Sequence, residues 1–282
     1  MTQTYQRPAP FDWPDGARIG FSVTYAFEAF KYASQIKLER AKPGTEDHFS
    51  LSYGEYGAKA GIWRTFDLLD EFGLKATFDI SGATCELYPH IIKEMHQRGH
   101  EVAGHGWVND YFADDGDPEG EFRVMKETTE AIENLIGERP VGWASPANLR
   151  SDNTLNFQAR LGLTWNADDA SGDLPFIQEA EGKRIVILPK VNLPSNDLVV
   201  YAFPKNPPGM FFDFFKDTFD LLYEEGEKGS PKWAEVVLHT HVAGRPTLVP
   251  ALRRIFDYVQ GHEGVHYARR RDVAQWVLER DA

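Results

Sequence analysis

Short apolar runs alternate with longer amphipathic segments along most of the chain. The runs are rich in β-branched and aromatic residues, which is typical of buried strands. They fall at 18–25, 75–81, 101–104, 141–144, 163–167, 184–188, 198–203, 234–239 and 265–268. The segments between them carry apolar residues three to four positions apart, which predicts helices at 57–72, 89–98, 119–136, 154–161, 208–225, 248–260 and 272–280. Glycine follows several of these helices, at the position where a helix usually stops.

This alternation predicts an α/β fold with a parallel sheet covered by helices. About seven such units fit a distorted (β/α) barrel better than an open sheet. We expect a single domain over 1–282, with an N-terminal extension at 1–17 and an irregular insertion at 28–53. The β-rich stretch 176–205 contains prolines between its two strand-like runs, and we interpret it as a hairpin-like insertion.

Composition narrows the class of protein. Apolar residues make up 42% of the 282 residues, enough for a large core. The formal net charge of −13 would repel nucleic acids and anionic membranes, so neither is expected as a partner. The single cysteine, Cys85, excludes an internal disulfide and a thiolate metal cluster. With no secretory signal or membrane-length apolar run in the sequence, we expect a cytoplasmic protein that acts on a small molecule.

Polar and aromatic side chains gather just after the predicted strands, where barrels of this kind place their chemistry. The candidates are Tyr25, Glu28, His105, Trp107, Asn109, Ser145, Arg150, Asp168, Asp169, His239 and His241. Each also has an ordinary structural explanation. His105 could be a packed core histidine, the Asp168-Asp169 pair could cap a loop, and Trp107 could be a core residue. His239 and His241 lie two apart on a predicted strand, so both rings should face one side, as metal ligands, as acid and base, or as one core and one surface residue.

Several segments together resemble the polysaccharide deacetylase, or NodB-homology, superfamily. They are K-A-T-F-D-I-S-G at 75–82, G-H-E-V-A-G-H-G at 99–106, R-P-V-G-W-A-S-P at 139–146 and L-H-T-H at 238–241. Two more, E-Y-G-A-K-A-G-I-W-R at 55–64 and W-N-A-D-D-A-S-G-D-L-P-F at 165–176, look like the branch with cofactor-independent bacterial allantoinase and cyclic imide hydrolases. The resemblance implies a distorted barrel that hydrolyses a C–N bond, and related small-molecule enzymes of this branch are typically homo-oligomers, so a dimer or tetramer is expected.

The resemblance also implies a metal site from which this sequence departs. Metal-using members carry two acidic residues after the first strand and an H-x-x-x-H pair after the third. Here Thr24 and Ala26 match the two acids, His105 matches the first histidine and Asn109 the second. Zinc needs three or four firm ligands, so we expect no metal, with Zn as the alternative if the ligands are rearranged. His239 matches the late histidine that serves as general acid in the family.

Hydrolysis of an amide or imide without a metal needs an activated water, a proton for the leaving nitrogen and stabilisation of the oxyanion. The candidate bases are Glu28, Glu55, Asp169 and a neutral His105, and backbone N–H groups near His105 and Gly106 could serve the oxyanion. Tyr25, Trp107, Asn109, Ser145, Arg150 and His241 are expected to bind substrate. Strained cyclic imides and ureides suit such a site because they are more electrophilic than sugar acetamides. The alternatives are a carbohydrate N-deacetylase with rearranged metal ligands, and a barrel with lapsed, lyase or isomerase chemistry.

Overall fold

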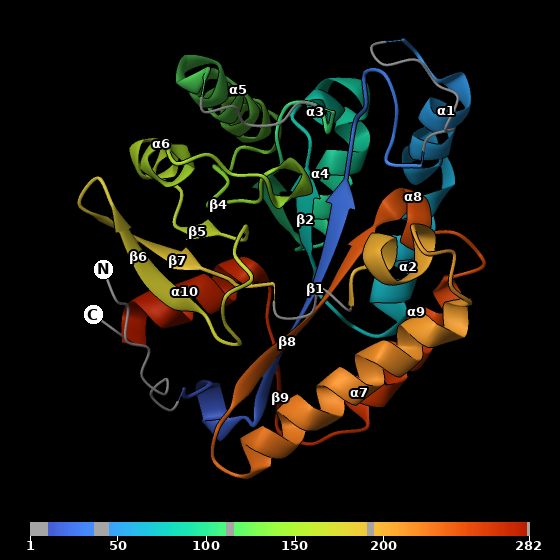
Figure 1. Ribbon diagram of the computed structural model, residues 1–282, viewed down its shortest axis with the longest axis vertical. Helices are drawn as coiled ribbons and strands as arrows, with labels where there is room; N and C mark the ends of the chain where they lie inside the picture. The colour runs from blue at the N-terminus through green and yellow to red at the C-terminus, as the bar shows by residue number, and fades with distance from the viewer. Residues whose placement is uncertain (1–10, 37–44, 111–115, 191–194, 281–282) are drawn as a thin grey trace.

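The computed structural model describes residues 11–36, 45–110, 116–190 and 195–280, and it has an α/β architecture (Figure 1). The strands are β1 (Ile19–Phe27), β2 (Thr77–Ile80), β3 (Glu101–Gly104), β4 (Gly142–Trp143), β5 (Trp165–Asn166), β6 (Phe176–Ala180), β7 (Lys183–Ile187), β8 (Lys232–His239) and β9 (Val265–Tyr267). They form one sheet in the order β6-β7-β5-β4-β3-β2-β1-β8, and β9 also pairs with β1. All neighbouring strands are parallel except the β6–β7 pair. The α/β class and the parallel sheet expected from the alternation are confirmed.

Helices connect and cover these strands. The α-helices are α1 (His48–Tyr56), α2 (Ile62–Glu71), α3 (Ala83–Leu87), α4 (Pro89–Gln97), α5 (Pro118–Ile136), α6 (Thr154–Leu161), α7 (Pro208–Glu227), α8 (Thr240–Ala243), α9 (Val249–Gln260) and α10 (Arg270–Arg280). A π-helical segment, Gly57–Gly61, joins α1 to α2. In Figure 1, α7 and α9 lie side by side beside β8 and β9, whereas α5 and α6 lie near β4 and β5. No helix in the described part of the chain is both long and apolar enough to cross a membrane.

The stretch 176–205 differs from its predicted form. The antiparallel hairpin is β6–β7, and β7 also pairs in parallel with β5, so it belongs to the main sheet. Leu198–Ala202 is a π-helical segment and not the predicted strand at 198–203. The run Leu-Val-Val-Tyr-Ala has high β propensity, but Asn196 accepts the backbone N–H groups of Leu198 and Val199 through its side chain and starts a helical turn.

The side chains of β1 separate into two faces, and this separation decides which residues reach the site. The odd-numbered residues of β1, among them Val23 and Tyr25, join a large core cluster with the apolar faces of α2, α4, α7 and α9. The even-numbered residues point to the opposite, inner face of the sheet. There the Ser22 hydroxyl donates to the carbonyl of Ala268, and the Thr24 hydroxyl donates to the Glu235 carboxylate. The alternation follows from strand geometry, in which successive side chains point to opposite faces.

The inner face of the sheet carries a buried network of ion pairs that joins α10 to β2 and β8. Arg270, the first residue of α10, is fully buried and donates to Asp79 on β2 (2.7 Å) and to Glu235 on β8 (2.7 Å). Glu101 on β3 accepts hydrogen bonds from Thr77 and from the Trp165 indole. Apolar residues of α10 pack near this network in the same cluster as Trp165 and Trp233. The C-terminal helix therefore supplies the counter-charge for two strands of the sheet.

Candidate active site

The carboxyl ends of β8, β1 and β3 meet at one edge of the sheet and present three ionisable side chains. Ala26 lies opposite His239 on β8 and opposite Asp79 on β2, while Ile80 lies opposite Gly104 on β3. Glu28 follows the last residue of β1, His105 follows the last residue of β3, and His239 ends β8. Parallel pairing brings these ends to the same level, which places Glu28 between the two histidines.

Glu28 is the centre of this arrangement. One of its carboxylate oxygens, Oε1, lies 3.4 Å from His105 Nε2 and 3.9 Å from His239 Nε2. The other oxygen, Oε2, lies 3.8 Å from His241 Nδ1. The Asn109 amide donates to Oε1 at 2.6 Å, and the Gln35 amide donates to both oxygens. We call these six residues, Glu28, Gln35, His105, Asn109, His239 and His241, the Glu28 cluster.

The cluster keeps Glu28 ionised although it is buried. The Glu28 side chain is only 1% exposed. Burial raises the pKa of Glu28, but the neighbouring imidazoles, His239 foremost, outweigh it and lower the pKa to about 2. At neutral pH the centre of the site is therefore a carboxylate that is screened from water.

His239 is held as a proton donor by Asp197. The ring atom Nδ1 lies 2.6 Å from Asp197 Oδ1, and the backbone N–H of His239 donates to Asp197 Oδ2 at 2.8 Å. Burial lowers the pKa of His239, but the carboxylates of Asp197 and Glu28 outweigh it and raise the pKa above its usual value. With Nδ1–H donated to Asp197, the Nε2 atom faces the site and carries the transferable proton. Sequence reasoning missed Asp197 because it lies in the stretch interpreted as a hairpin, outside any strand end.

His241 lies on a different element from the one predicted. The strand β8 ends at His239, and Thr240–Ala243 forms the short helix α8, so His239 and His241 are not two residues apart on one strand. The two rings nevertheless lie 5.8 Å apart, and His241 contacts Phe30 and Tyr53 edge to face. Burial in this aromatic pocket lowers the pKa of His241 to about 4, so its imidazole is neutral at neutral pH.

His105 and Asn109 are positioned by the turn after β3. The ring atom Nδ1 of His105 lies 2.6 Å from the carbonyl of Ala144 on the neighbouring strand segment, which fixes Nδ1 as the donor and leaves Nε2 facing Glu28. Gly106 has a φ of +69°, which lets the chain turn sharply here. The backbone N–H of His105 donates to Ile80 within the sheet, so it is not available to an oxyanion as predicted.

Tyr25, Glu55 and Asp169 are among the predicted residues that do not join the cluster. Tyr25 is fully buried on the helix-facing side of β1 and stacks on Phe78, because its odd position on the strand points it away from the inner face. Glu55 is exposed on α1 and pairs with Lys59 one turn later. Asp169 accepts hydrogen bonds from the backbone N–H and the hydroxyl of Ser171, so it caps a loop, which was the structural alternative to a catalytic role.

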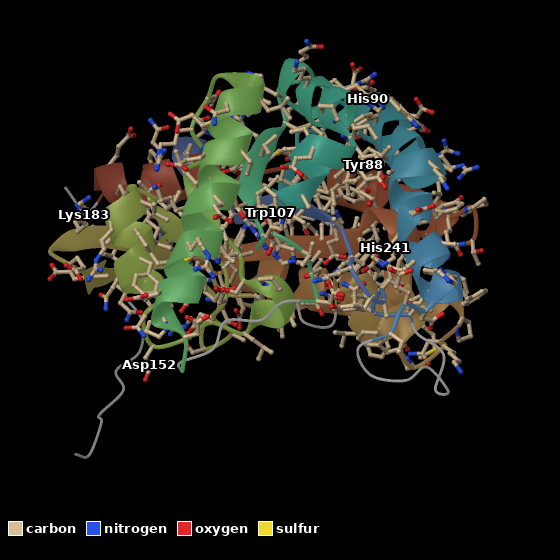
Figure 2. All side chains as sticks on the ribbon, turned by 90° about the horizontal axis from the view of Figure 1, so that it is seen from above. Tyr88, His90, Trp107, Asp152, Lys183 and His241 are labelled. Carbon is tan, nitrogen blue, oxygen red and sulfur yellow. The ribbon has the colours of Figure 1, made fainter. Side chains whose placement is uncertain are left out.

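The remaining predicted residues lie around the edge of the barrel. Trp107 turns outward and lines a surface hollow of about 640 Å³ with residues of α3 and α5. Figure 2 shows Trp107 on the α5 side of the molecule and His241 on the side of α1 and α2. Ser145 is buried and donates through its backbone and hydroxyl to Asp168, so it braces the neighbouring strand end. Arg150 is exposed and lines a separate surface hollow near α6.

The donor set does not match the metal site of the family. Thr24 donates its hydroxyl to Glu235, Ala26 has no donor atom, and Asn109 turns its amide nitrogen toward Glu28. Of the positions that hold the metal in metal-using members, only His105 offers a ligand. Within residues 11–36, 45–110, 116–190 and 195–280, no group of three or more His, Cys, Asp or Glu side chains is arranged to hold a metal ion.

Comparison with known proteins agrees with this architecture. Residues 42–165 match the family model described as polysaccharide deacetylase. A peptidoglycan deacetylase from Helicobacter pylori is 24% identical, covering 84% of this chain and 90% of the relative.

Two solved structures are similar over almost their whole length. A probable polysaccharide deacetylase from Pseudomonas aeruginosa is 30% identical with a TM-score of 0.85, and a PuuE allantoinase is 29% identical with a TM-score of 0.84. Each comparison covers 95% of this chain and 93% of the other. The chain belongs to the polysaccharide deacetylase, or NodB-homology, superfamily.

Proposed function

We propose that the protein hydrolyses a C–N bond in a small cyclic or linear amide of the imide or ureide type, without a metal. The observation that carries this proposal is the Glu28 carboxylate, buried among three histidines at the end of the sheet. Its place at the carboxyl ends of parallel strands is where enzymes with related barrels hold their reacting groups. The likeness to an allantoinase structure supports a ureide or imide over other amides.

The base in this proposal is His105. A carboxylate with a pKa near 2 is a weak general base at neutral pH, so Glu28 is not the group that takes the proton. In its neutral form His105 would offer the lone pair of Nε2, because Nδ1 is committed to the Ala144 carbonyl. In this scheme a water beside His105 gives one proton to Nε2 as its oxygen attacks the carbonyl carbon. Glu28 then stabilises the imidazolium that forms, at the 3.4 Å separation that the structure has.

The acid in this proposal is His239. When the tetrahedral intermediate collapses, the C–N bond breaks and the leaving nitrogen needs a proton. His239 would donate that proton from Nε2, 3.9 Å from the Glu28 carboxylate, and Asp197 orients the ring and favours its charged form. In this scheme the second amide N–H of Asn109, which is not donated to Glu28, would donate to the oxyanion. The products are a carboxylic acid and an amine or amide nitrogen.

A matched pair of carboxylates tests the proposal. Purified protein is offered hydantoins, cyclic imides and N-acetylglucosamine oligomers, and ring opening or acetate release is followed by NMR. Glu28→Gln keeps the shape but removes the charge, and we expect kcat to fall on the order of 10²-fold or more. Glu55→Gln makes the same change on the surface of α1 and should leave kcat unchanged. Equal loss in both variants, or none in either, would contradict the proposal.

The names of the curated relatives support a second candidate, a metal-dependent carbohydrate N-deacetylase. Elemental analysis of protein purified without added metal separates the two. Stoichiometric zinc, together with acetate release that dipicolinate abolishes, would support the deacetylase and refute the metal-free scheme.

A further inference from the structure

Arg245, the second residue after α8, contacts both α1 and α8. Its guanidinium carbon lies 3.7 Å from the centre of the Tyr53 ring and 4.1 Å from the centre of the Tyr56 ring. Its Nε atom donates to the carbonyl of His241 at 2.8 Å, and its Nη2 atom donates to the carbonyl of Tyr53 at 3.3 Å. One side chain therefore joins α1 to α8, which lie next to each other in Figure 1, by stacking and by hydrogen bonds.

Two further contacts join the same helices. Arg64 on α2 donates to the Tyr56 hydroxyl and, at 3.3 Å, to the carbonyl of Gly244. The backbones are also close, because a Cβ at Gly57 would lie 3.2 Å from the backbone nitrogen of His241. Arg245 therefore belongs to a packed junction of α1, α2 and α8. We call its own contacts with Tyr53, Tyr56 and His241 the Arg245 junction.

The insertion that follows β1 is tied together by serine side chains. Its two described parts are residues 28–36 and residues 45–56, and the second part includes α1. The Ser34 hydroxyl donates to the carbonyl of Ser50 at 2.8 Å, and the two hydroxyls lie 2.9 Å apart. The two parts therefore contact each other, and we call them together the insertion wall.

The insertion wall supplies the aromatic surroundings of His241. The rings of Phe30 and Tyr53 lie edge to face with the His241 ring, with centres 5.7 and 6.1 Å away. The Gln35 amide, also on this wall, donates to the Glu28 carboxylate. An insertion wall that moved outward would expose His241 to water. The contacts that hold the wall therefore also determine the environment of the site.

We propose that Arg245 is a positioning residue, which holds α1 against α8 and thereby keeps the insertion wall closed over His241. This inference concerns the free protein and applies whichever bond the site cleaves. Stacking against two rings while donating in two directions requires a flat, forked side chain, which arginine has and lysine lacks. A contact with a structural role alone would contribute stability, but it would not control whether water reaches His241.

The protonation of His241 reports on the Arg245 junction. The charged groups that act on its ring, within the described residues, are Glu28, His239 and Arg245. Burial is the largest effect and lowers the pKa of His241 to about 4, the carboxylate raises this pKa, and the two cations lower it. Phe30 and Tyr53 add no charge at neutral pH, since burial raises the pKa of the Tyr53 phenol. Opening the wall admits water and loss of Arg245 removes a cation, so both changes raise the pKa of His241 toward its ordinary value of 6.5.

An NMR titration of the histidine rings tests the inference in protein that carries isotope-labelled histidine. The signal missing from the His241→Gln spectrum assigns His241. In the wild type this ring should stay neutral down to about pH 5, whereas in Arg245→Gln it should titrate closer to 6.5. Arg253→Gln, which breaks an exposed ion pair between α9 and Glu71, is the matched control and should leave the titration of His241 unchanged.

Two more variants separate the junction from its charge and from a failure to fold. Arg245→Lys keeps the positive charge but loses the flat face and the forked donors, so the pKa of His241 should still rise. Tyr56→Leu leaves Arg245 in place and removes one of its two stacking partners. The pKa of His241 should rise in this variant too, by a smaller amount, and the result decides the matter if Arg245→Gln does not fold. Hydantoin opening, which rests on the proposed hydrolase function, should lose about tenfold or more in kcat/KM in Arg245→Gln.

The outcomes distinguish this inference from the proposed function. If Tm falls in these variants while the titration of His241 stays that of the wild type, Arg245 has a structural role alone and the inference is overturned. If Arg245→Gln raises the pKa of His241 but Arg245→Lys and Tyr56→Leu do not, only the charge acts, and the inference is again overturned. If His241 titrates as expected in all three variants but the wild type opens no ring, the inference stands and the proposed function fails.

Discussion

Adding one methyl group at Gly61 should damage both stability and the site. Gly61 ends the π-helical segment that packs against α8, the helix that carries His241. A Cβ at Gly61 would lie 2.1 Å from the carbonyl oxygen of Thr240, and a Cβ at Gly244 would lie 2.4 Å from the Cα of Gly61. Both contacts are with backbone, so no side chain can rotate away. Gly61→Ala must therefore push α8 and the π-helical segment apart.

The size of the effect follows from two opposing contributions. Overpacking in a tightly packed region costs typically about 1–3 kcal/mol, and the backbone contact at Gly61 places it at the upper end. Alanine is favoured over glycine inside a helix by about 1 kcal/mol. The difference is a loss of about 2 kcal/mol. For a domain of this size we expect Tm to fall by about 4–8 °C. Because α8 moves, His241 shifts relative to Glu28, and kcat/KM should fall about tenfold or more.

Thermal unfolding and steady-state kinetics on three variants check this reasoning. Gly57→Ala places its Cβ 2.7 Å from the Thr240 hydroxyl, a side chain that can turn, so its Tm should fall less. Gly209→Ala lies in α7 with its nearest neighbour, an Arg254 nitrogen, at 3.8 Å, so Tm should be unchanged or slightly raised. A Gly61→Ala protein that is as stable as the wild type, or as active, would refute the close packing of these two segments.

The other predictions concern the site itself. His239→Ala should lower kcat on the order of 10²-fold or more at saturating substrate, and equal activity would remove it from the mechanism. Because Asp197 helps to raise the pKa of His239, the protonated acid is lost as pH rises through that pKa. Asp197→Asn should therefore move the basic limb of the kcat–pH profile to lower pH, and an unmoved limb would contradict the assigned acid. His105→Gln should keep the Tm and lose turnover, whereas a destabilised but fully active variant would make His105 a packing residue. Chelation should leave both activity and Tm unchanged, and stoichiometric zinc after purification without added metal would contradict this.

The sequence pattern predicted most of the fold because each element carries its own signal. The helix at 154–161 and the strand at 101–104 begin and end where the pattern placed them. Gly162 ends the helix in a left-handed conformation, and Gly99, also left-handed, separates α4 from the strand. The errors fall where a local interaction overrides propensity. The Asn196 side chain starts a helical turn in a β-prone run, and α8 begins directly after His239 within what looked like one strand.

The candidate site was predicted in part, for a similar reason. Glu28, His105, Asn109, His239 and His241 meet as expected because strand ends converge whatever the loops do. Other members could not be found this way. Asp197 and Gln35 reach the cluster from irregular segments, where no periodicity shows the direction of a side chain. Tyr25 was predicted on the wrong face of its strand, because its odd position points it toward the helices. Glu55 was predicted in the site, but its helix points it to solvent.

The buried network around Arg270 has a consequence for the order in which the molecule is completed. Asp79 and Glu235 lie on strands that are synthesised before Arg270, the residue that donates hydrogen bonds to both carboxylates. Leaving a buried charge without its partner costs about 3–5 kcal/mol, a large part of the total stability of an ordinary domain. The nascent sheet should therefore stay loosely packed until α10 emerges. A truncation just before α10 should be degraded, even though every strand is still present.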